Sequence, residues 1–320
     1  MDTIDTIRDQ VLDALSFLDP RWQSYIIQIL RLCAWLVLLA VIFAPLERLF
    51  ALHPKKIFRK AIFTDIGYYF LNSVATSILL SLPVALLAWL VHRLIPGHFT
   101  SAVAALPLWL RITATVVVGE LGFYWGHRWS HELPLLWRFH AIHHSPDHLD
   151  FLVNTRAHPI DMVFTRFCGI VPLYILGLAS PVSSGASGLI PALLILAGTI
   201  WGFFIHANVR WRFGPFEWLI ATPAFHHWHH TNDGPTYINK NFSSTLPFLD
   251  RLFGTFYLPK HKQPTLYGID QPVSPALFDQ LIEPFLFWRK TPPPFPSAAP
   301  PGCGEPASAA TAPNNLSSPS

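Results

Sequence analysis

The stretch HRWSHELPLLWRFHAIHHS, residues 127–145, carries two clusters of histidine. His127 and His131 are four residues apart, and His140, His143 and His144 are separated by three and four residues. Residues three or four apart lie on the same face of a helix, so each cluster directs its imidazoles toward one point. The spacing therefore predicts two helical segments that present nitrogen ligands to a shared site.

A third cluster, HHWHH at residues 226–230, repeats the spacing of the second one. His206 lies upstream of it, at the expected end of an apolar helix, and can join the same site. The candidate ligands are His127, His131, His140, His143, His144, His206, His226, His229 and His230. Nine imidazoles suffice for two metal ions with four or five nitrogens each. Histidine tracts also occur as low-complexity sequence, but a repeated HxxHH spacing favours ligands.

Imidazole binds iron, copper, zinc and nickel, and the spacing alone does not choose among these metals. The clusters contain no carboxylate. Glu120 lies seven residues before His127, two helical turns back on the same face. An acidic side chain within an apolar segment is a functional candidate. We expect Glu120 to accept an N–H from a ligand histidine and fix its orientation, with pairing to Arg111 or to another helix as the structural alternative.

The composition indicates contact with lipid. Hydrophobic residues make up 51% of the 320 residues and charged residues only 13%, against roughly 25% charged in a typical soluble domain. There are 25 Phe and 12 Trp, more apolar surface than one soluble core absorbs. The net charge of +3 gives no reason to expect a nucleic-acid partner. The three cysteines form no CxxC pair, so they predict neither a zinc ribbon nor a disulfide framework.

Apolar stretches long enough to enter a membrane span Tyr25–Leu46, Ile66–Val91 and Leu106–Trp125. Residues 167–209 contain no charged side chain and are interrupted at Ser180–Gly185, which predicts a helical hairpin that returns to the side it left. The expected fold is an all-α integral membrane protein. Four to five membrane-embedded helices would carry a cytoplasmic helical cap that holds the histidine-rich two-metal site.

Basic residues in short loops predict the orientation of the helices in the membrane. The loop around residues 48–60 holds Arg48, Lys55, Lys56, Arg59 and Lys60, whereas the loop around 92–104 holds only Arg93. The first loop and the histidine clusters are therefore expected on the cytoplasmic side. Three regions follow: an acidic segment 1–21, a membrane domain 22–290 and a tail 291–320 rich in Pro, Ala and Ser, which we expect to be disordered.

The residues around the histidines resemble the fatty acid hydroxylase / sterol desaturase superfamily, whose members carry HxxxH, HxxHH and a second HxxHH between membrane helices. The matching segments are YWGHRWSH at 124–131, LWRFHAIHHS at 136–145, RAHP at 156–159, TP at 222–223, NF at 241–242 and LDRLFGT at 249–255. The resemblance extends from about residue 60 to 260. The chain departs from one branch, the fatty-acid 2-hydroxylases, because Gly202 leaves no HxxxH ending at His206.

The resemblance implies an O₂-dependent oxidoreductase with two non-haem iron ions. Such an enzyme hydroxylates or desaturates an unactivated C–H bond of a lipid or sterol-like substrate. Electrons would come from a separate partner, a cytochrome b5-like protein or a ferredoxin with its reductase. The sequence leaves open the lipid, the carbon attacked, the choice between hydroxylation and desaturation, the electron donor, the oligomeric state and whether His158 is a further ligand.

Two other readings belong to different classes of protein. A membrane electron-transfer protein would hold haem between one histidine from each of two helices, which triplets at HxxHH spacing do not suit. A metal transporter would place its ionisable residues near the middle of the bilayer. The histidine clusters instead fall at the ends of the predicted helices and beyond.

Overall fold

The structure is a computed structural model. It describes residues 10, 13, 15–16, 18–54, 59, 61–179, 186–271 and 273–286, with several residues of 186–195 described by their backbone alone. The expected turn at Ser180–Gly185, three basic residues of the first loop (Lys55, Lys56 and Lys60) and the tail 291–320 lie outside the described residues, as does most of the acidic segment 1–21.

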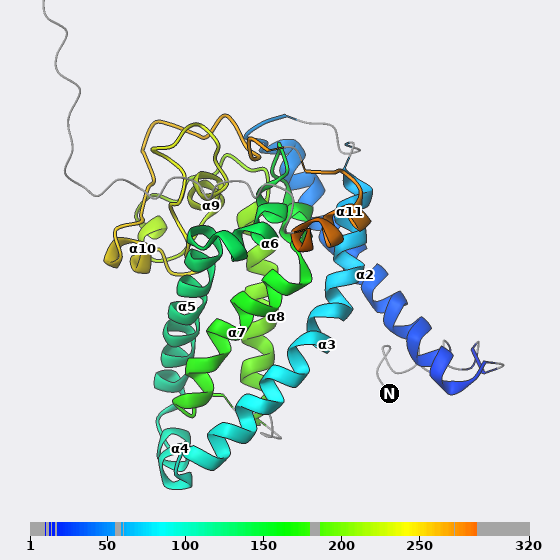
Figure 1. Ribbon diagram of the computed structural model, residues 1–320, viewed down its shortest axis with the longest axis vertical. Helices are drawn as coiled ribbons and strands as arrows, with labels where there is room; N and C mark the ends of the chain where they lie inside the picture. Colours follow the sequence, from blue (N-terminus) through cyan, green and yellow to red (C-terminus); the bar gives the residue numbers. More distant parts are fainter. Residues whose placement is uncertain are drawn as a thin grey trace, which may run out of the picture.

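Two long helices, α2 (Pro20–Leu49) and α3 (Ile62–Leu94), form one side of the molecule (Figure 1). Helix α2 begins where the Asp19 side chain accepts a hydrogen bond from the Arg21 N–H at 2.9 Å, with Pro20 in the first turn, where its missing N–H costs nothing. At 30 and 33 residues, the helices are about 45–50 Å long and exceed the roughly 30 Å hydrocarbon core of a bilayer.

After α3 the chain turns, and α5 (Leu108–Glu132) runs back toward the end of the molecule where α3 begins (Figure 1). Helix α4 (Gly97–Ala104) precedes α5, with a bend of 113° between them. Helix α7 (Pro159–Ile175) packs against α5 and α3 (Figure 1). Helix α8 (Ala186–His206) contacts the short helices η1 (Phe151–Thr155) and α9 (Pro223–His229). The α5–α7 contact is close because glycines face it, and a methyl group on Gly122 would meet the backbone of Cys168 and Gly169.

The described helices include two that are long and apolar enough to cross a membrane, α2 and α3, and a third if the bent pair α4–α5 counts as one span. Within α8, Leu196–His206 is a shorter apolar helix. The outward surfaces of α2 and α3 are apolar, with Val37, Val41, Ile78 and Leu82 all more than 60% exposed. Such surfaces suit a lipid environment. The expected total of four to five membrane-embedded helices stays a prediction.

Short helices form a cap at one end of the long ones (Figure 1). They are α6 (Pro134–His144), η1 (Phe151–Thr155), η2 (Gly214–Trp218), α9 (Pro223–His229), α10 (Phe248–Leu252), α11 (Leu277–Ile282) and η3 (Glu283–Phe285). The described residues form no strand, and an isolated bridge joins Thr231 to Tyr267. The predicted all-α class is therefore confirmed, and the helical cap is observed; its cytoplasmic placement remains a prediction.

Buried ion pairs attach the cap to α3. Asp65, fully buried in the first turn of α3, pairs with Arg59 and Arg156, and Arg59 also binds Asp150, with 2.8 Å between Nη2 and Oδ1. The Asp150 carboxylate in turn caps η1 by accepting the Leu152 and Val153 N–H groups. Each buried charge has an opposite partner, which is the condition under which buried charges are tolerated.

Candidate metal centre

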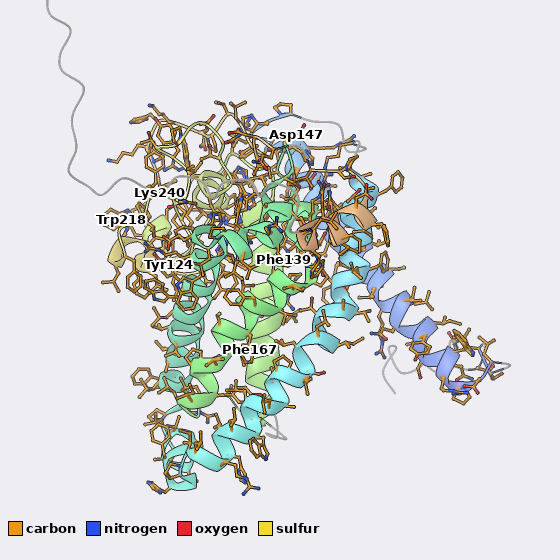
Figure 2. All side chains as sticks on the ribbon, viewed as in Figure 1. Tyr124, Phe139, Asp147, Phe167, Trp218 and Lys240 are labelled. Carbon is orange, nitrogen blue, oxygen red and sulfur yellow. The ribbon has the colours of Figure 1, made fainter. Side chains whose placement is uncertain are left out.

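All nine predicted ligand histidines lie where the long helices meet the cap, and none is more than 8% exposed. They come from α5, α6, α8 and the α9 region, so four chain segments meet at one place. Figure 2 shows Tyr124 on α5 and Lys240 close to the level of the cap, whereas Phe167 on α7 lies far below it. The expectation that the three histidine clusters come together is confirmed.

The nine histidines form two groups. The five-histidine group comprises His127, His131, His140, His144 and His229, and the four-histidine group comprises His143, His206, His226 and His230. Within each group, one nitrogen of every imidazole lies within 4.8 Å of the others. The groups adjoin, because the rings of His144 and His230 stack with their centroids 4.3 Å apart. This division matches the four or five nitrogens per ion expected from the ligand count.

The spacing of the nitrogens fits a cation in the five-histidine group. His131 and His140 both donate through Nδ1, to Asn239 Oδ1 at 3.2 Å and to Asp161 Oδ2 at 2.9 Å. With both imidazoles neutral, the two Nε2 atoms carry lone pairs, yet these nitrogens lie 3.0 Å apart. Two such atoms cannot share a hydrogen bond. Ligands bound at about 2.1 Å to one metal ion stand about 3 Å apart, so a shared cation accounts for the contact.

The four-histidine group shows the same arrangement. Nδ1 of His143 donates to the Arg156 carbonyl at 3.0 Å, and Nδ1 of His206 donates to the Gly202 carbonyl at 2.7 Å. The Nε2 atoms of these two histidines face each other at 3.3 Å. Nε2 of His226 lies 3.0 Å from that of His206 and 3.1 Å from that of His230. This group also fits a cation bound through nitrogen.

Two further nitrogens support this fit. Nε2 of His144 and Nε2 of His229 are buried and have no hydrogen-bond partner among the described residues. A buried polar atom without a partner is costly, and in native proteins it usually marks a ligand or an ion. The nine histidines thus have the donor type, the burial and the spacing that a two-metal centre requires. Their role as ligands belongs to the proposal below.

Contacts on the far side of the imidazoles fix their orientation. Nδ1 of His127 donates to the Phe242 carbonyl at 2.6 Å, and Nδ1 of His229 donates to the Lys240 carbonyl at 2.8 Å. Together with Asn239, these acceptors lie in one loop after α9. Such contacts hold the ring and its tautomer, so that Nε2 points inward. No spacing of side chains marks the backbone acceptors, because a backbone carbonyl belongs to every residue.

Asp161, at the start of α7, is the carboxylate that orients a histidine. It is 6% exposed and accepts the Nδ1 hydrogen of His140. Asp161 was not among the predicted site residues, and this role was expected of Glu120. A signal was present, because Asp161 is an acidic residue that opens an apolar helix three positions after His158.

The expected contact of Glu120 with a ligand histidine was wrong. Its carboxylate accepts hydrogen bonds from the Ser244 hydroxyl at 3.0 Å and from the Thr245 N–H at 2.7 Å. His127, two turns away on the same helix, uses a backbone carbonyl instead. The side chain of Glu120 therefore holds the loop that follows Phe242, and Arg111, the alternative partner, hydrogen-bonds to Ala104.

Two other histidines of the cap have structural contacts. His158 caps α7, since its Nδ1 accepts the Ile160 N–H at 3.1 Å and its Nε2 donates to the Leu281 carbonyl at 3.2 Å. His227, between two candidate ligands, donates from Nε2 to the Ala207 carbonyl at 3.0 Å, and its Nδ1 lies 3.2 Å from the Tyr267 hydroxyl. Neither histidine belongs to the two groups.

Burial favours the neutral form of three candidate ligands, His143, His229 and His230. Burial and, to a smaller extent, repulsion from His140 lower the pKa of His143 to about 4. Burial also holds the pKa of His229 and His230 well below the ordinary value, with additional repulsion from His127 and His144 respectively. A neutral imidazole is the form that binds a metal ion. Each of these imidazoles therefore keeps a nitrogen that is free of protons at pH 7 and available to bind a metal cation.

An apolar groove of about 640 Å³ lies between α5 and α7. Leu121, Trp125 and Trp129 line it from α5, and Phe167 and Val171 line it from α7. These α5 residues lie on the face opposite the histidines, since Trp125 and Trp129 are each two residues from His127 and positions two apart differ by about 200°. The groove therefore faces the surroundings of the helices rather than the two histidine groups.

Together, the helices and the two histidine groups define an all-helical membrane protein with a candidate two-metal centre. Residues 112–255 match the family model described as "Fatty acid hydroxylase". This range covers α5 to the Thr255 region and contains all nine histidines. Over these residues the chain resembles the fatty acid hydroxylase family, and its predicted resemblance to the fatty acid hydroxylase / sterol desaturase superfamily is confirmed.

Curated relatives include the ornithine lipid hydroxylase OlsE of Rhizobium tropici, 37% identical over 183 residues, which are 56% of this chain and 51% of that protein. The alkylglycerol monooxygenase of Xenopus tropicalis is 31% identical over 48% of this chain and 32% of its own length. Methylsterol monooxygenase 2-2 of Arabidopsis thaliana is 28% identical over 47% and 55%. The chain thus spans about a third to a half of these relatives. No solved structure matches it.

Proposed function

We propose that this chain is a membrane-bound, O₂-dependent di-iron oxidase that hydroxylates an unactivated C–H bond of a lipid. The observation that carries the proposal is the division of nine buried histidines into groups of five and four with inward Nε2 atoms. Iron bound at these groups would supply the O₂ chemistry that side chains alone cannot perform. The relatives, named as lipid and sterol hydroxylases or monooxygenases, favour hydroxylation over desaturation.

The protein's own part in this reaction is to orient the ligands and exclude water. Carbonyl and carboxylate acceptors hold the Nδ1 hydrogens, so that each imidazole keeps its Nε2 lone pair toward the centre. The buried aromatic rings of Trp137 and Phe242 contact the five-histidine group, with centroids 5.3 Å and 5.1 Å from that of His131. These rings keep bulk water away from the side of the site they cover.

The same geometry argues against the two other classes of protein. Haem needs one axial nitrogen on each face of a flat macrocycle, whereas Nε2 atoms 3.0 Å apart leave no space for a ring between them. A transported ion must leave again, which is difficult from four or five oriented imidazoles that are at most 8% exposed. Both observations favour a resident two-metal centre.

The substrate would be a membrane lipid with an alkyl or sterol body. Helices α2 and α3 present large apolar surfaces, and the groove between α5 and α7 is lined by apolar side chains. A lipid dissolved in the same bilayer can approach the helices beneath the cap. Its polar head would remain near the cap, in line with the relatives that are named for ornithine lipid and alkylglycerol.

The remaining parts of the proposal concern orientation and electrons. The cap and the histidine groups would face the cytoplasm, where a cytochrome b5-like protein or a ferredoxin with its reductase supplies the electrons. Reporter fusions test the orientation: fusions after Lys56 and Ser320 should report the cytoplasm, and a fusion at His98 the opposite side. A cytoplasmic signal at His98 would contradict this layout.

Lipid analysis tests the activity directly. The full chain is expressed in a bacterial host with a ferredoxin and its reductase, and the lipids are compared by mass spectrometry with those of cells expressing His229→Ala. The parent chain should add about 16 mass units, one oxygen atom, to a lipid class, and the variant should not. A loss of about two mass units would indicate desaturation, and identical lipids from both cultures would contradict the proposal.

A further inference from the structure

One carboxylate near the histidines, Glu47, lies outside the family match and outside both histidine groups. It belongs to the last turns of α2, the helix that diverges most from the others (Figure 1). Its Oε1 atom accepts two backbone hydrogen bonds, from the Phe151 N–H at 2.7 Å and from the Asn208 N–H at 2.9 Å. One side chain thus joins two segments that are distant in the sequence.

The segment that contains Asn208 leads directly to the four-histidine group. Asn208 is two residues after His206, which ends α8. The residue between them, Ala207, is fully buried, and its carbonyl accepts the Nε2 hydrogen of His227 at 3.0 Å. His227 adjoins His226, another member of the group. The position of Asn208 therefore affects two ligands: His206, two residues earlier in the chain, and His226, whose neighbour His227 donates to the Ala207 carbonyl.

The side chain of Asn208 attaches the same segment to the end of α2. Its Oδ1 accepts the His53 N–H at 3.0 Å, and its Nδ2 donates to the His53 carbonyl at 2.7 Å. Two residues further, the Arg210 N–H donates to the Phe50 carbonyl at 2.9 Å. The chain leaving α2 and the chain leaving α8 thus run together, with Glu47 at the start of the paired region.

The segment that contains Phe151 leads to the same group by another route. Phe151 begins η1, and the residue that follows η1 is Arg156. The carbonyl of Arg156 accepts the Nδ1 hydrogen of His143 at 3.0 Å. Through Phe151, Glu47 therefore holds the short helix that ends at the acceptor of a third ligand, His143.

The five-histidine group is held by other residues. Its backbone acceptors lie in the loop at Lys240 and Phe242, and the N–H of Phe242 donates to Asp250 Oδ1 at 2.7 Å. Glu120 holds the continuation of this loop at Thr245. Among the described residues, no hydrogen bond joins this loop to α2. The two groups share helices α6 and α9, but the backbone acceptors that orient them lie in different segments, and the α2 carboxylate holds segments next to the four-histidine group.

From these contacts we infer that Glu47 is a positioning residue for the four-histidine group, so that α2 determines the occupancy of one of the two metal sites. The inference rests on the proposed function, because it assumes that the histidines bind metal. Without the carboxylate, two buried N–H groups lose their acceptor and the segments carrying His206 and the acceptor of His143 separate. Metal ligation tolerates displacements of only about 0.2 Å.

The test measures iron bound per chain in purified full-length protein after anaerobic loading with Fe(II). Glu47→Ala removes the acceptor, and Glu47→Gln keeps an uncharged one and protects against the chance that the alanine variant does not fold. Asp19→Asn is the matched control, since Asp19 also accepts a backbone N–H on α2, at its other end. His230→Ala removes a ligand of the same group.

The expected parent value is about two irons per chain. Glu47→Ala should retain about one, as should His230→Ala, and Glu47→Gln should bind the second iron about 10- to 100-fold more weakly. Asp19→Asn should match the parent. Two tightly bound irons in both Glu47 variants, or loss of both irons from soluble Glu47→Gln, would overturn the inference while leaving the proposed function intact. A parent chain that binds no iron would overturn both.

Discussion

The close contact between α5 and α7 predicts that Gly122→Ala disrupts the five-histidine group. The added methyl carbon would stand 3.0 Å from the carbonyl carbon of Cys168 and from Cα of Gly169, and closer still to the Cys168 oxygen. Carbon atoms in ordinary contact are about 3.5–4.0 Å apart. Because the obstacle is backbone, it cannot rotate away, and the two helices must separate by about 0.5–1 Å.

This separation is large for a metal site. Helix α5 carries His127 and His131, and α7 carries Asp161, the acceptor of His140. A shift of about 0.5–1 Å exceeds the tolerance of about 0.2 Å for ligand distances. Overpacking a core also costs about 1–3 kcal/mol, which outweighs the gain of about 1 kcal/mol from replacing glycine within a helix. We therefore expect one bound iron instead of two and a lower melting temperature.

Two other glycines provide the controls. A methyl group on Gly198 of α8 meets no atom within 4 Å, so Gly198→Ala should match or exceed the stability of the parent. On Gly119 the nearest atom is Leu173 Cδ1, at 3.4 Å at the end of a side chain, so Gly119→Ala should fall between the two. Iron content and thermal unfolding in detergent measure the series. Parent-like values for Gly122→Ala would refute the argument that this helix contact sets the ligand positions.

Three further outcomes follow from the site. His229→Ala should lose one iron and all activity, whereas the same change at His98, outside the groups, should alter neither; full activity of the first variant would remove that histidine from the ligand set. Asp161→Asn should weaken metal affinity or activity about 10- to 100-fold, measured by chelator competition, because His140 loses a charged acceptor. Burial lowers the pKa of His143 from 6.5 to about 4, so protons bind preferentially to the unfolded chain. The free energy of unfolding of the metal-free protein should therefore have its full value above about pH 6.5 and fall as the pH decreases toward about 4. A melting temperature that stays constant across this pH range would contradict the prediction.

The sequence by itself identified the nine candidate ligands and indicated a helical protein with apolar helices long enough to cross a membrane. Both rest on local periodicity. Imidazoles three and four residues apart must share a helix face, and long uncharged stretches must avoid water. Segments 127–160 and 206–260 come together as predicted. The prediction rested on apolar helices that leave and re-enter the same side of a membrane.

Only the tertiary structure decided how the nine histidines divide. His143 and His144 are adjacent in the sequence, yet they belong to different groups, because neighbouring residues on a helix point about 100° apart. Helix periodicity likewise placed Glu120 on the face of His127 but could not reveal that the Phe242 carbonyl occupies the histidine's Nδ1. The partner of Glu120 is a loop more than a hundred residues away in the sequence.

The contacts that orient the ligands are mostly nonlocal hydrogen bonds to backbone groups. Every residue has a carbonyl and nearly every residue an N–H, so no side-chain pattern marks the ones that face an imidazole or a carboxylate. Glu47 became recognisable only when the fold placed it against the chain that follows His206. Asp161 is marked in the sequence as an acidic residue at the start of an apolar helix, but only the fold shows that its partner is His140. The sequence specifies which atoms are able to bind a metal, and the packing of distant segments specifies how these atoms are aimed.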